Sequence, residues 1–444
     1  MKTFRLLPLI FALGTTLTMP LQAQSLVDLY QSARGFDASY QSSKSLYDAT
    51  LARADQAKAA ILPVAGLAIG VSRSAEQYNP SAGNQADFSY GTENATLSAS
   101  QPLYRPGNWA SYRQGLKQVD IAKAQLVAAD QDLIIRVGQA YFDVLAAQDT
   151  LTFVQAQKTA VAEQLASAKR TFEVGTSTIT DTRDAQARYD LVIAQEIAAD
   201  NDLRVKKIAL DQLVGKNDAR PQPLAQPLVL PALLPNDANI WVQQSEPDHP
   251  TIRQAQIALD VAQLETKKAE AGHKPTLDLV TNYSAINNLD GTSSPGSSAS
   301  RINARSIGLS FNLPLFAGYA TQNRIRETVA LEEKARNDLE GAKRAVAQGT
   351  RTAFFGVLSG QGQVKALEAA EASSQSALDA NKLGYQVGVR INIDVLNSQS
   401  QLFQTKRDLA KARYDVLVGG LKLRQANGTL KAEDLNSVNA LLTQ

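Results

Sequence analysis

Cysteine is absent from this 444-residue sequence, and histidine, methionine and tryptophan occur only twice each. Without cysteine the chain cannot form disulfides, bind a metal through thiolates, use a cysteine nucleophile or carry a lipid on a terminal cysteine. The scarcity of tryptophan and histidine leaves little material for an aromatic-rich ligand pocket. The formal net charge is only +2 at pH 7, so the bulk charge does not indicate nucleic acid as a partner.

A long apolar run occurs at the N-terminus. Lys2 and Arg5 precede an apolar stretch at 6–17, and Ala23 provides a small residue suited to cleavage. This is the layout of a secretory signal peptide, so we assign residues 1–23 to one rather than to a buried helix. Beyond it, no apolar stretch reaches the roughly 18 residues that a membrane-spanning helix needs. The sequence therefore predicts an exported protein.

No catalytic constellation stands out in the sequence. His249 lies between an aspartate and a proline, and His273 precedes a predicted strand, so both are expected at the surface or in a bend rather than as ligands. The stretch GTSSPGSS at 291–298 lacks the following lysine-bearing helix of a phosphate-binding loop. We therefore expect no enzyme activity, no cofactor and no metal.

The sequence contains an internal duplication, first visible in two motifs, FEVGTSTITDTRD at 172–184 and YQVGVRINIDVLN at 385–397. Each motif has an aromatic residue three positions before a glycine and an aspartate six positions after that glycine. The similarity continues at an offset of 212 or 213 residues, as in AYFDVL at 140–145 and AFFGVL at 353–358. A constant offset of this kind indicates two copies of one structural unit.

The duplication divides the chain into domains. We expect a first repeat at 24–215 and a second at 237–428, each with the order helix, strand, strand, long helix, turn and helix. The segment 216–236 between them is rich in proline and is expected to be an extended linker. Residues 429–444 are expected to form a C-terminal tail.

Two segments of each repeat alternate between apolar and small polar residues, with the period of a β-strand. These segments are 64–73, 92–103, 277–284 and 305–315. A β-sandwich alternates in the same way. A length of about 10 residues, a hydroxyl-rich second face and polar connecting loops at 76–89 and 287–300 favour strands of a membrane barrel instead.

Four such strands cannot close a barrel, and open strand edges are not tolerated in lipid. We therefore expect three chains to share a barrel of about twelve strands, wide enough for a water-filled channel. Pro102 and Pro314 are expected to end a strand where it meets a helix.

The predicted helices form the larger part of the chain. No proline occurs after Pro106 up to Phe172, and an apolar or small residue recurs every seven positions, which indicates a coiled-coil seam. The members of this row are Val119, Leu126, Leu133, Ala140, Ala147, Val154, Val161 and Ala168. A helix of about 65 residues would span roughly 100 Å. The second repeat has a row of smaller residues, including Gly349, Gly356 and Gly384, for which we expect a role in packing or bending.

These features resemble the TolC-type outer-membrane channel-tunnels, the outer membrane efflux protein family. The repeat, the strands, the long helices and the two Val-Gly turns cover residues 25–428, and the most specific stretch is YQVGVRINIDVLNSQSQLFQTKRDLAKARYDVL. The resemblance implies a mainly α fold with membrane β structure. It further implies a homotrimer whose twelve-stranded barrel, in lipid of the bacterial outer membrane, joins a helical barrel in the periplasm. The linker would then lie at the equatorial region of the trimer.

The resemblance also implies a function. The protein would be the exit duct of a tripartite export system, receiving cargo from a periplasmic adaptor and an inner-membrane transporter of the ABC, RND or MFS type. The cargo would be small toxic molecules, type I secreted polypeptides, or both. The alternative is a periplasmic coiled-coil adaptor with no pore of its own.

The two Val-Gly motifs are expected to form the turns at the far end of the helices. Gly175 and Gly388 would supply the permissive backbone that reversal of the chain requires. Thr178, Thr180 and Asn392 are short polar residues suited to capping the returning helices.

The resemblance implies that polar links between these turns close the tip of the channel. Tyr385 and Arg390 of the second turn would bond Thr180 and Asp181 of the first. The family pattern also has two aspartates, three residues apart, that form acidic rings in the pore. Here the positions hold Asp394 and Asn397, so one ring would remain.

With one ring lost, cation selectivity would be weaker or more dependent on pH. Asp184 is an alternative source of charge near Asn397, and an ordinary surface charge at Asp184 is the competing interpretation.

Overall fold

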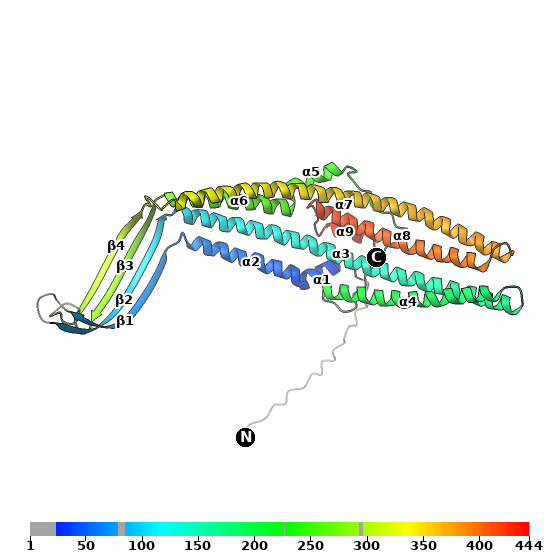
Figure 1. Cartoon of the computed structure of the whole chain (residues 1–444), viewed down its shortest axis with the longest axis horizontal. Helices are drawn as coiled ribbons and strands as arrows, with labels where there is room; N and C mark the ends of the chain where they lie inside the picture. Colours follow the sequence, from blue (N-terminus) through cyan, green and yellow to red (C-terminus); the bar gives the residue numbers. More distant parts are fainter. Residues whose placement is uncertain (1–23, 79–84, 226, 293–295, 444) are drawn as a thin grey trace, which may run out of the picture.

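The computed structural model describes residues 24–78, 85–225, 227–292 and 296–443, and its overall shape is elongated (Figure 1). A four-stranded sheet forms one end, and two pairs of long helices extend to the other end. The predicted signal peptide and the central residues of both strand-connecting loops lie outside the described residues.

The two repeats have the same order of elements. The first consists of α1 (Leu26–Phe36), α2 (Ala38–Ala59), β1 (Val64–Tyr78), β2 (Ala86–Tyr104), α3 (Pro106–Glu173) and α4 (Ile179–Val214). The second consists of α5 (Ala238–Asp248), α6 (Pro250–Glu270), the short 3-10 helix η1 (Ala271–His273), β3 (Thr276–Asn288), β4 (Ser300–Asn312), α7 (Ala320–Gln386) and α8 (Asn392–Ala426). A final helix, α9 (Asp434–Asn439), lies within the predicted C-terminal tail.

The strands form one antiparallel sheet in the order β1-β2-β3-β4. The register aligns Leu67 of β1 with Leu97 of β2, Leu97 with Tyr283 of β3, and Tyr283 with Arg305 of β4. Because side chains alternate along each strand, every second residue from this row belongs to the same face. That face carries the predicted apolar residues, so the strand periodicity of the sequence is confirmed.

The strand ends differ from the prediction. β1 and β2 pair as far as Tyr78 and Ala86, well into the segment expected to be a loop, because backbone pairing continues after the apolar residues end. β4 ends at Asn312, before Pro314, since proline cannot donate a ladder hydrogen bond. Pro102 instead lies inside β2, where the register with β3 shifts between Pro102 and Tyr104.

The helices α3 and α7 contain 68 and 67 residues, about 100 Å each at 1.5 Å per residue. α3 packs against α4, and α7 packs against α8, so each repeat ends in an antiparallel helical hairpin. Leu133, Ala147, Val154, Val161 and Ala168 of the predicted seven-residue row are buried, which confirms the seam along α3. Within the described residues, no helix has both the length and the apolarity needed to cross a membrane.

Two glycines of the small-residue row of α7 have no partner in the described part of the chain. A Cβ atom added at Gly349 or Gly356 would meet no atom within 4 Å, whereas one at Gly384 would lie 2.7 Å from Cγ of Arg390. Of these three glycines of the row, only Gly384 is required by packing within the described part of one chain. The face of α7 that carries Gly349 and Gly356 is open in the described part of the chain.

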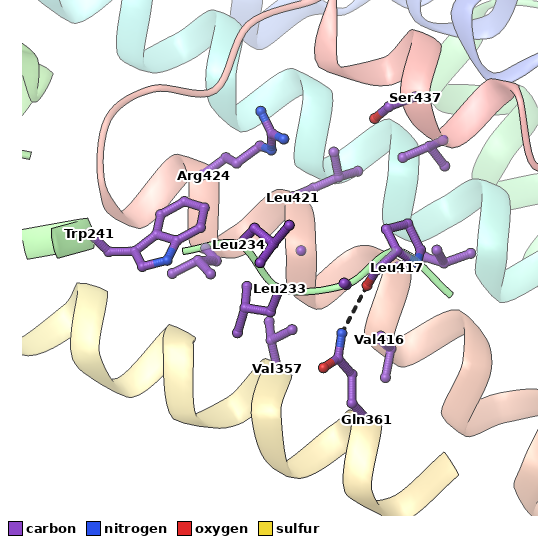
Figure 2. Close-up of a pocket in the computed structure, with 15 residues that line it drawn as sticks. Leu233, Leu234, Trp241, Val357, Gln361, Val416, Leu417, Leu421, Arg424 and Ser437 are labelled. Atoms are coloured by element: carbon purple, nitrogen blue, oxygen red, sulfur yellow. Dashed lines mark hydrogen bonds between the residues drawn. The ribbon is translucent and has the colours of Figure 1, made fainter. Parts of the chain in front are cut away.

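The largest core lies near the middle of the molecule, where α1, α3, α4, α8 and α9 meet. Tyr141 and Phe142 of α3 are buried there, and the Tyr141 hydroxyl donates a 2.9 Å hydrogen bond to the carbonyl oxygen of Gln222 in the linker. Figure 2 shows the linker passing over a cavity of about 120 Å³ between α7 and α8. Gln361 of α7 holds it there by donating a 3.0 Å hydrogen bond to the carbonyl oxygen of Pro231.

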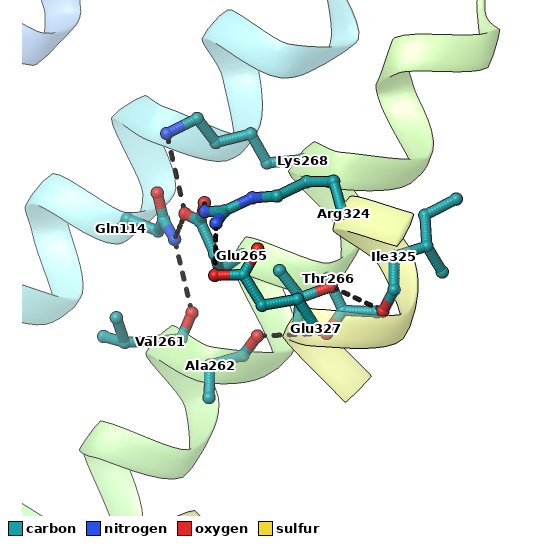
Figure 3. A network of polar contacts seen from close by, with 10 residues as sticks. Gln114, Val261, Ala262, Glu265, Thr266, Lys268, Arg324, Ile325 and Glu327 are labelled. Carbon is teal, nitrogen blue, oxygen red and sulfur yellow. Dashed lines mark hydrogen bonds and ion pairs between the residues drawn. The ribbon is translucent and has the colours of Figure 1, made fainter. Parts of the chain in front are cut away.

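A polar network joins the helices next to the sheet (Figure 3). The carboxylate of Glu265 on α6 accepts from Nε2 of Gln114 on α3 at 2.8 Å and from Nη2 of Arg324 on α7 at 2.6 Å. The hydrogen bond from Gln114, together with Arg324, lowers the pKa of Glu265. One carboxylate thus ties three helices together where the helical part meets the strands.

Candidate functional site at the helical tip

Both hairpins end in a tight turn at the same end of the molecule. Gly175 has φ +78° and Gly388 has φ +80°, a region that residues with a Cβ atom rarely adopt. The amide of Gly175 donates to the carbonyl oxygen of Phe172, and that of Gly388 donates to Tyr385. Two equivalent turns with the same left-handed glycine therefore reverse the chain in the two repeats.

The first turn is closed by a capping box at the start of α4. The hydroxyl of Thr178 accepts from the amide of Asp181 at 3.2 Å, and the carboxylate of Asp181 accepts from the amide of Thr178 at 3.0 Å. Thr180 lies exposed between these two residues. The carboxylate of Asp181 therefore stabilises its own helix end in the single chain.

The second turn is organised around Arg390. Its aliphatic stem lies against Gly384, and Nη1 is 3.6 Å from the carboxylate of Asp394, four residues later in the chain. Tyr385 is half-buried and packs against the cluster of Leu378, Val395 and Leu402.

Within the described part of one chain, no hydrogen bond or ion pair joins Tyr385 or Arg390 to Thr180 or Asp181. These links between the turns stay a prediction. So does the acidic ring at Asp394, whose side chain is 34% exposed.

Asn392 does not cap α8 as expected, because the helix begins after Ile391 and has no side-chain cap. Asn392 is instead 1% exposed and lies between the two hairpins. Its Oδ1 accepts from Nε2 of Gln164 on α3, and its Nδ2 donates to the carbonyl oxygen of Asp181 at 3.3 Å. Asn392 is thus a bridge between the turns that sequence patterns did not reveal, since its partners lie more than 200 positions away.

Asn397 also makes a contact between hairpins. Its Oδ1 accepts from Nη2 of Arg188 on α4 at 2.7 Å. Asn397, which was expected to leave the pore without a second acidic ring, therefore binds the guanidinium group of Arg188. Within the described residues, no hydrogen bond or ion pair joins Asn397 to Asp184, so Asp184 as an alternative source of charge stays a prediction.

Farther from the tip, the seam between α3 and α8 contains a partly buried carboxyl group. The Tyr414 hydroxyl on α8 donates to Oδ2 of Asp149 on α3 at 2.6 Å. Burial raises the pKa of Asp149 and also that of Tyr414. The hairpins are therefore joined by polar contacts at the tip and by a buried hydroxyl–carboxyl pair nearer the core.

Three valines are exposed at the tip. Val174, Val387 and Val389 are 73%, 65% and 75% exposed. Exposed apolar groups gathered at one end are typical of a contact surface. The described residues contain no group of acidic, histidine or cysteine side chains arranged to hold a metal.

Comparison with known proteins identifies a family and several relatives of this chain. The sequence model of the family described as outer membrane efflux protein matches residues 29–216 and 241–429. The outer membrane protein TolC of Vibrio cholerae is 34% identical over 438 residues, 98% of this chain and 98% of that protein. The alkaline protease secretion protein AprF of Pseudomonas aeruginosa is 31% identical over 359 residues, 80% of this chain and 73% of that protein.

A solved structure has the same fold. The outer membrane protein VceC of Vibrio cholerae superposes with a TM-score of 0.77 over 91% of this chain and 96% of that chain, at 20% sequence identity.

Proposed function

This chain belongs to the outer membrane efflux protein family, and from that premise we propose that it is the trimeric exit duct of a tripartite export system. The duct lies in the bacterial outer membrane, with its helical part in the periplasm. It passes cargo outward and catalyses no reaction.

The sheet is the observation that carries this proposal. In the described part of the chain, β1 and β4 each have one neighbouring strand, so two strand edges are open. Leu67, Ile69, Val71, Ile307, Leu309 and Phe311 lie on one face and are between 65% and 77% exposed. Lipid accepts such a face but not open edges. Three copies of the four-stranded sheet remove the edges by closing into a twelve-stranded barrel.

The open face of α7 supports the same assembly. Gly349 and Gly356 leave room for close approach of another helix, and the neighbouring Phe355 and Leu358 are 57% and 41% exposed. We assign this face to a second copy of the chain, because burial of such apolar side chains stabilises association.

The tip is the proposed gate. Asn392 holds the two turns of one chain together, and Tyr385 and Arg390 add links to Thr180 and Asp181 when three chains assemble. Solvated links of this kind contribute about 1 kcal/mol or less each, which suits a gate that must open. Three copies of Asp394 near the axis then favour cations, while Asn397 contributes no charge.

The partners follow from the position of the tip. The exposed valines of the two turns face the periplasm, and we assign them to contacts with a periplasmic adaptor and an inner-membrane transporter of the ABC, RND or MFS type. The efflux family supports small toxic molecules as cargo, and the relative named for protease secretion supports type I secreted polypeptides.

The experiment that tests this function compares a strain lacking the gene with the complemented strain. Retention of a fluorescent dye reports efflux, and proteins in the culture supernatant report secretion. We expect the deletion to increase dye retention, to remove at least one secreted polypeptide, or to do both. If both readouts match the complemented strain in the absence of a second gene of this family, the duct function is wrong.

Fractionation separates this function from the alternative of a periplasmic adaptor without a pore. We expect trimers in the outer-membrane fraction. Recovery of the protein only in the inner-membrane or periplasmic fraction would favour the adaptor.

A further inference from the structure

A polar cavity of about 390 Å³ lies in the seam between α8 and the α3/α4 hairpin. Its polar lining includes Arg188 and Gln195 of α4, Gln157 of α3, and Asn397, Gln404 and Arg407 of α8. Two of the twelve lining residues are arginines and none is acidic. The cavity is therefore positively charged.

Within the part of the chain that the structure describes, the two guanidinium groups are bound only by neutral amides. Arg188 donates from Nη2 to Oδ1 of Asn397 at 2.7 Å. Arg407 donates to Oε1 of Gln157 at 3.3 Å and to Oε1 of Gln404 at 2.6 Å. Among the described residues, no carboxylate oxygen forms an ion pair with either arginine. Each guanidinium has five N–H donors, so both keep donors for a ligand.

The charge of Arg407 is also poorly compensated by its surroundings. Burial lowers its pKa, although the neighbouring Asp408 acts in the opposite direction. The carboxylate of Asp408 accepts a 2.8 Å hydrogen bond from Nε2 of Gln404. A half-buried cation without a paired anion is less stable than a paired one, so a bound anion would stabilise this site.

One further polar group of the cavity lacks a partner. Oε1 of Gln195 is buried and forms no hydrogen bond in the structure. The two ends of a glutamine amide are interchangeable by rotation, so the same side chain can direct its N–H donors into the cavity. A ligand that accepts hydrogen bonds would satisfy this amide.

The spacing of the arginines indicates the shape of the ligand. Asn397 and Gln404, which hold the two guanidinium groups, are seven residues apart on α8, about 10 Å along the helix. Guanidinium groups bind carboxylate and phosphate groups through paired hydrogen bonds. Two such groups at the ends of one polar cavity suit an elongated molecule with an anionic group at each end.

We propose that this cavity binds a small organic dianion, with one anionic group on Arg188 and the other on Arg407. Because Arg188 belongs to the first hairpin and Arg407 to the second, the bound molecule links the two hairpins. Binding rests on the fold of a single chain and not on the proposed export function.

The test is isothermal titration calorimetry of the purified full-length protein in detergent, at fixed ionic strength. The probes are suberate, the shorter dicarboxylate succinate and the monocarboxylate butyrate. We expect saturable binding that is tightest for suberate and weakest for butyrate. Arg188→Gln and Arg407→Gln should each weaken suberate binding by about tenfold, as expected for a loss of about 1.4 kcal/mol.

Two further variants control for changes in folding. Arg204→Gln removes a 73% exposed arginine of α4 that pairs with Asp200 outside the cavity, and it should bind suberate like the wild type. Asn397→Asp places a carboxylate against Arg188 and should weaken binding while keeping the fold. Equal affinity for suberate and butyrate, absence of saturable binding, or unchanged binding in Arg188→Gln and Arg407→Gln would each overturn the proposal.

Discussion

Asn392, the first residue of α8, donates a hydrogen bond from Nδ2 to the carbonyl oxygen of Asp181 at 3.3 Å. This bond joins the second hairpin to the first turn of α4. The same side chain accepts from Gln164 of α3, so one buried amide touches both helices of the first hairpin.

Replacement of this amide should loosen the tip. Asn392→Ala leaves the amide of Gln164 and the carbonyl oxygen of Asp181 without their partner, at a cost of about 1–3 kcal/mol. We expect a higher single-channel conductance of the purified protein in planar bilayers. The matched control is Asn381→Ala, which removes a bond to Ser398 inside the second hairpin. Equal effects of the two variants would exclude a special role for the bond between hairpins.

Arg390→Ser tests the gate at the second turn. The change removes the pair with Asp394 and the predicted bonds to Thr180 and Asp181, each of which is about 1 kcal/mol or less when solvated. We expect an increased single-channel conductance. Arg183→Ser, at an exposed position near the start of α4, should leave the conductance unchanged. Unchanged conductance in Arg390→Ser would remove Arg390 from the gate.

Substitutions at Asp149 and at Tyr414 should have opposite effects on the free energy of unfolding. Tyr414→Phe leaves a partly buried carboxyl group without its hydrogen-bond donor and should lower the free energy of unfolding by about 1–3 kcal/mol. Asp149→Asn keeps an acceptor for the hydroxyl and removes the buried charge. We expect this variant to be at least as stable as the wild type at neutral pH.

The pH dependence of Asp149 has a definite sign. Its pKa is raised in the folded state above the ordinary value of 3.8. The protonated carboxyl group is therefore compatible with the fold below about pH 3.8, and the free energy of unfolding falls as the pH rises through the folded pKa and the group becomes charged. The stability gained in Asp149→Asn should therefore be larger near pH 8 than near pH 4, as measured by thermal unfolding in detergent. A gain that does not depend on pH would contradict this account.

Glu265 should respond to pH in the opposite direction. The hydrogen bond from Gln114, with further help from Arg324, lowers its pKa below the ordinary value of 4.5. The contribution of the Glu265 carboxylate to the free energy of unfolding is therefore present above about pH 4.5 and is lost as the pH falls through the folded pKa. Glu265→Gln should reduce the thermal stability at pH 7 but have less effect below pH 4.

The control for this prediction is Glu333→Gln, which changes an exposed glutamate of α7 paired with Arg336. We expect little change in its unfolding temperature at either pH. If Glu265→Gln behaves like this control at pH 7, the network between α3, α6 and α7 does not contribute to stability.

Local patterns in the sequence determined the architecture. The seven-residue row from Leu133 to Ala168 identified the seam of α3, because a coiled coil buries the same helix face at every repeat. Alternation in 64–73 and 305–315 identified strands, since successive side chains lie on opposite faces of a sheet. The glycines of the two similar motifs located both turns, at Gly175 and Gly388.

The contacts between the repeats depended on tertiary structure. Asn392 was expected to cap its own helix, but it bridges two hairpins, and Asp181 is held in a capping box with Thr178. The pairs of Arg188 with Asn397 and of Asp149 with Tyr414 join residues separated by 209 and 265 positions. A periodic pattern states which face of an element is buried but not which residue of a distant element lies opposite. The packing of α8 against α3 and α4 determines which residues pair across the seam. The same packing forms the positively charged cavity.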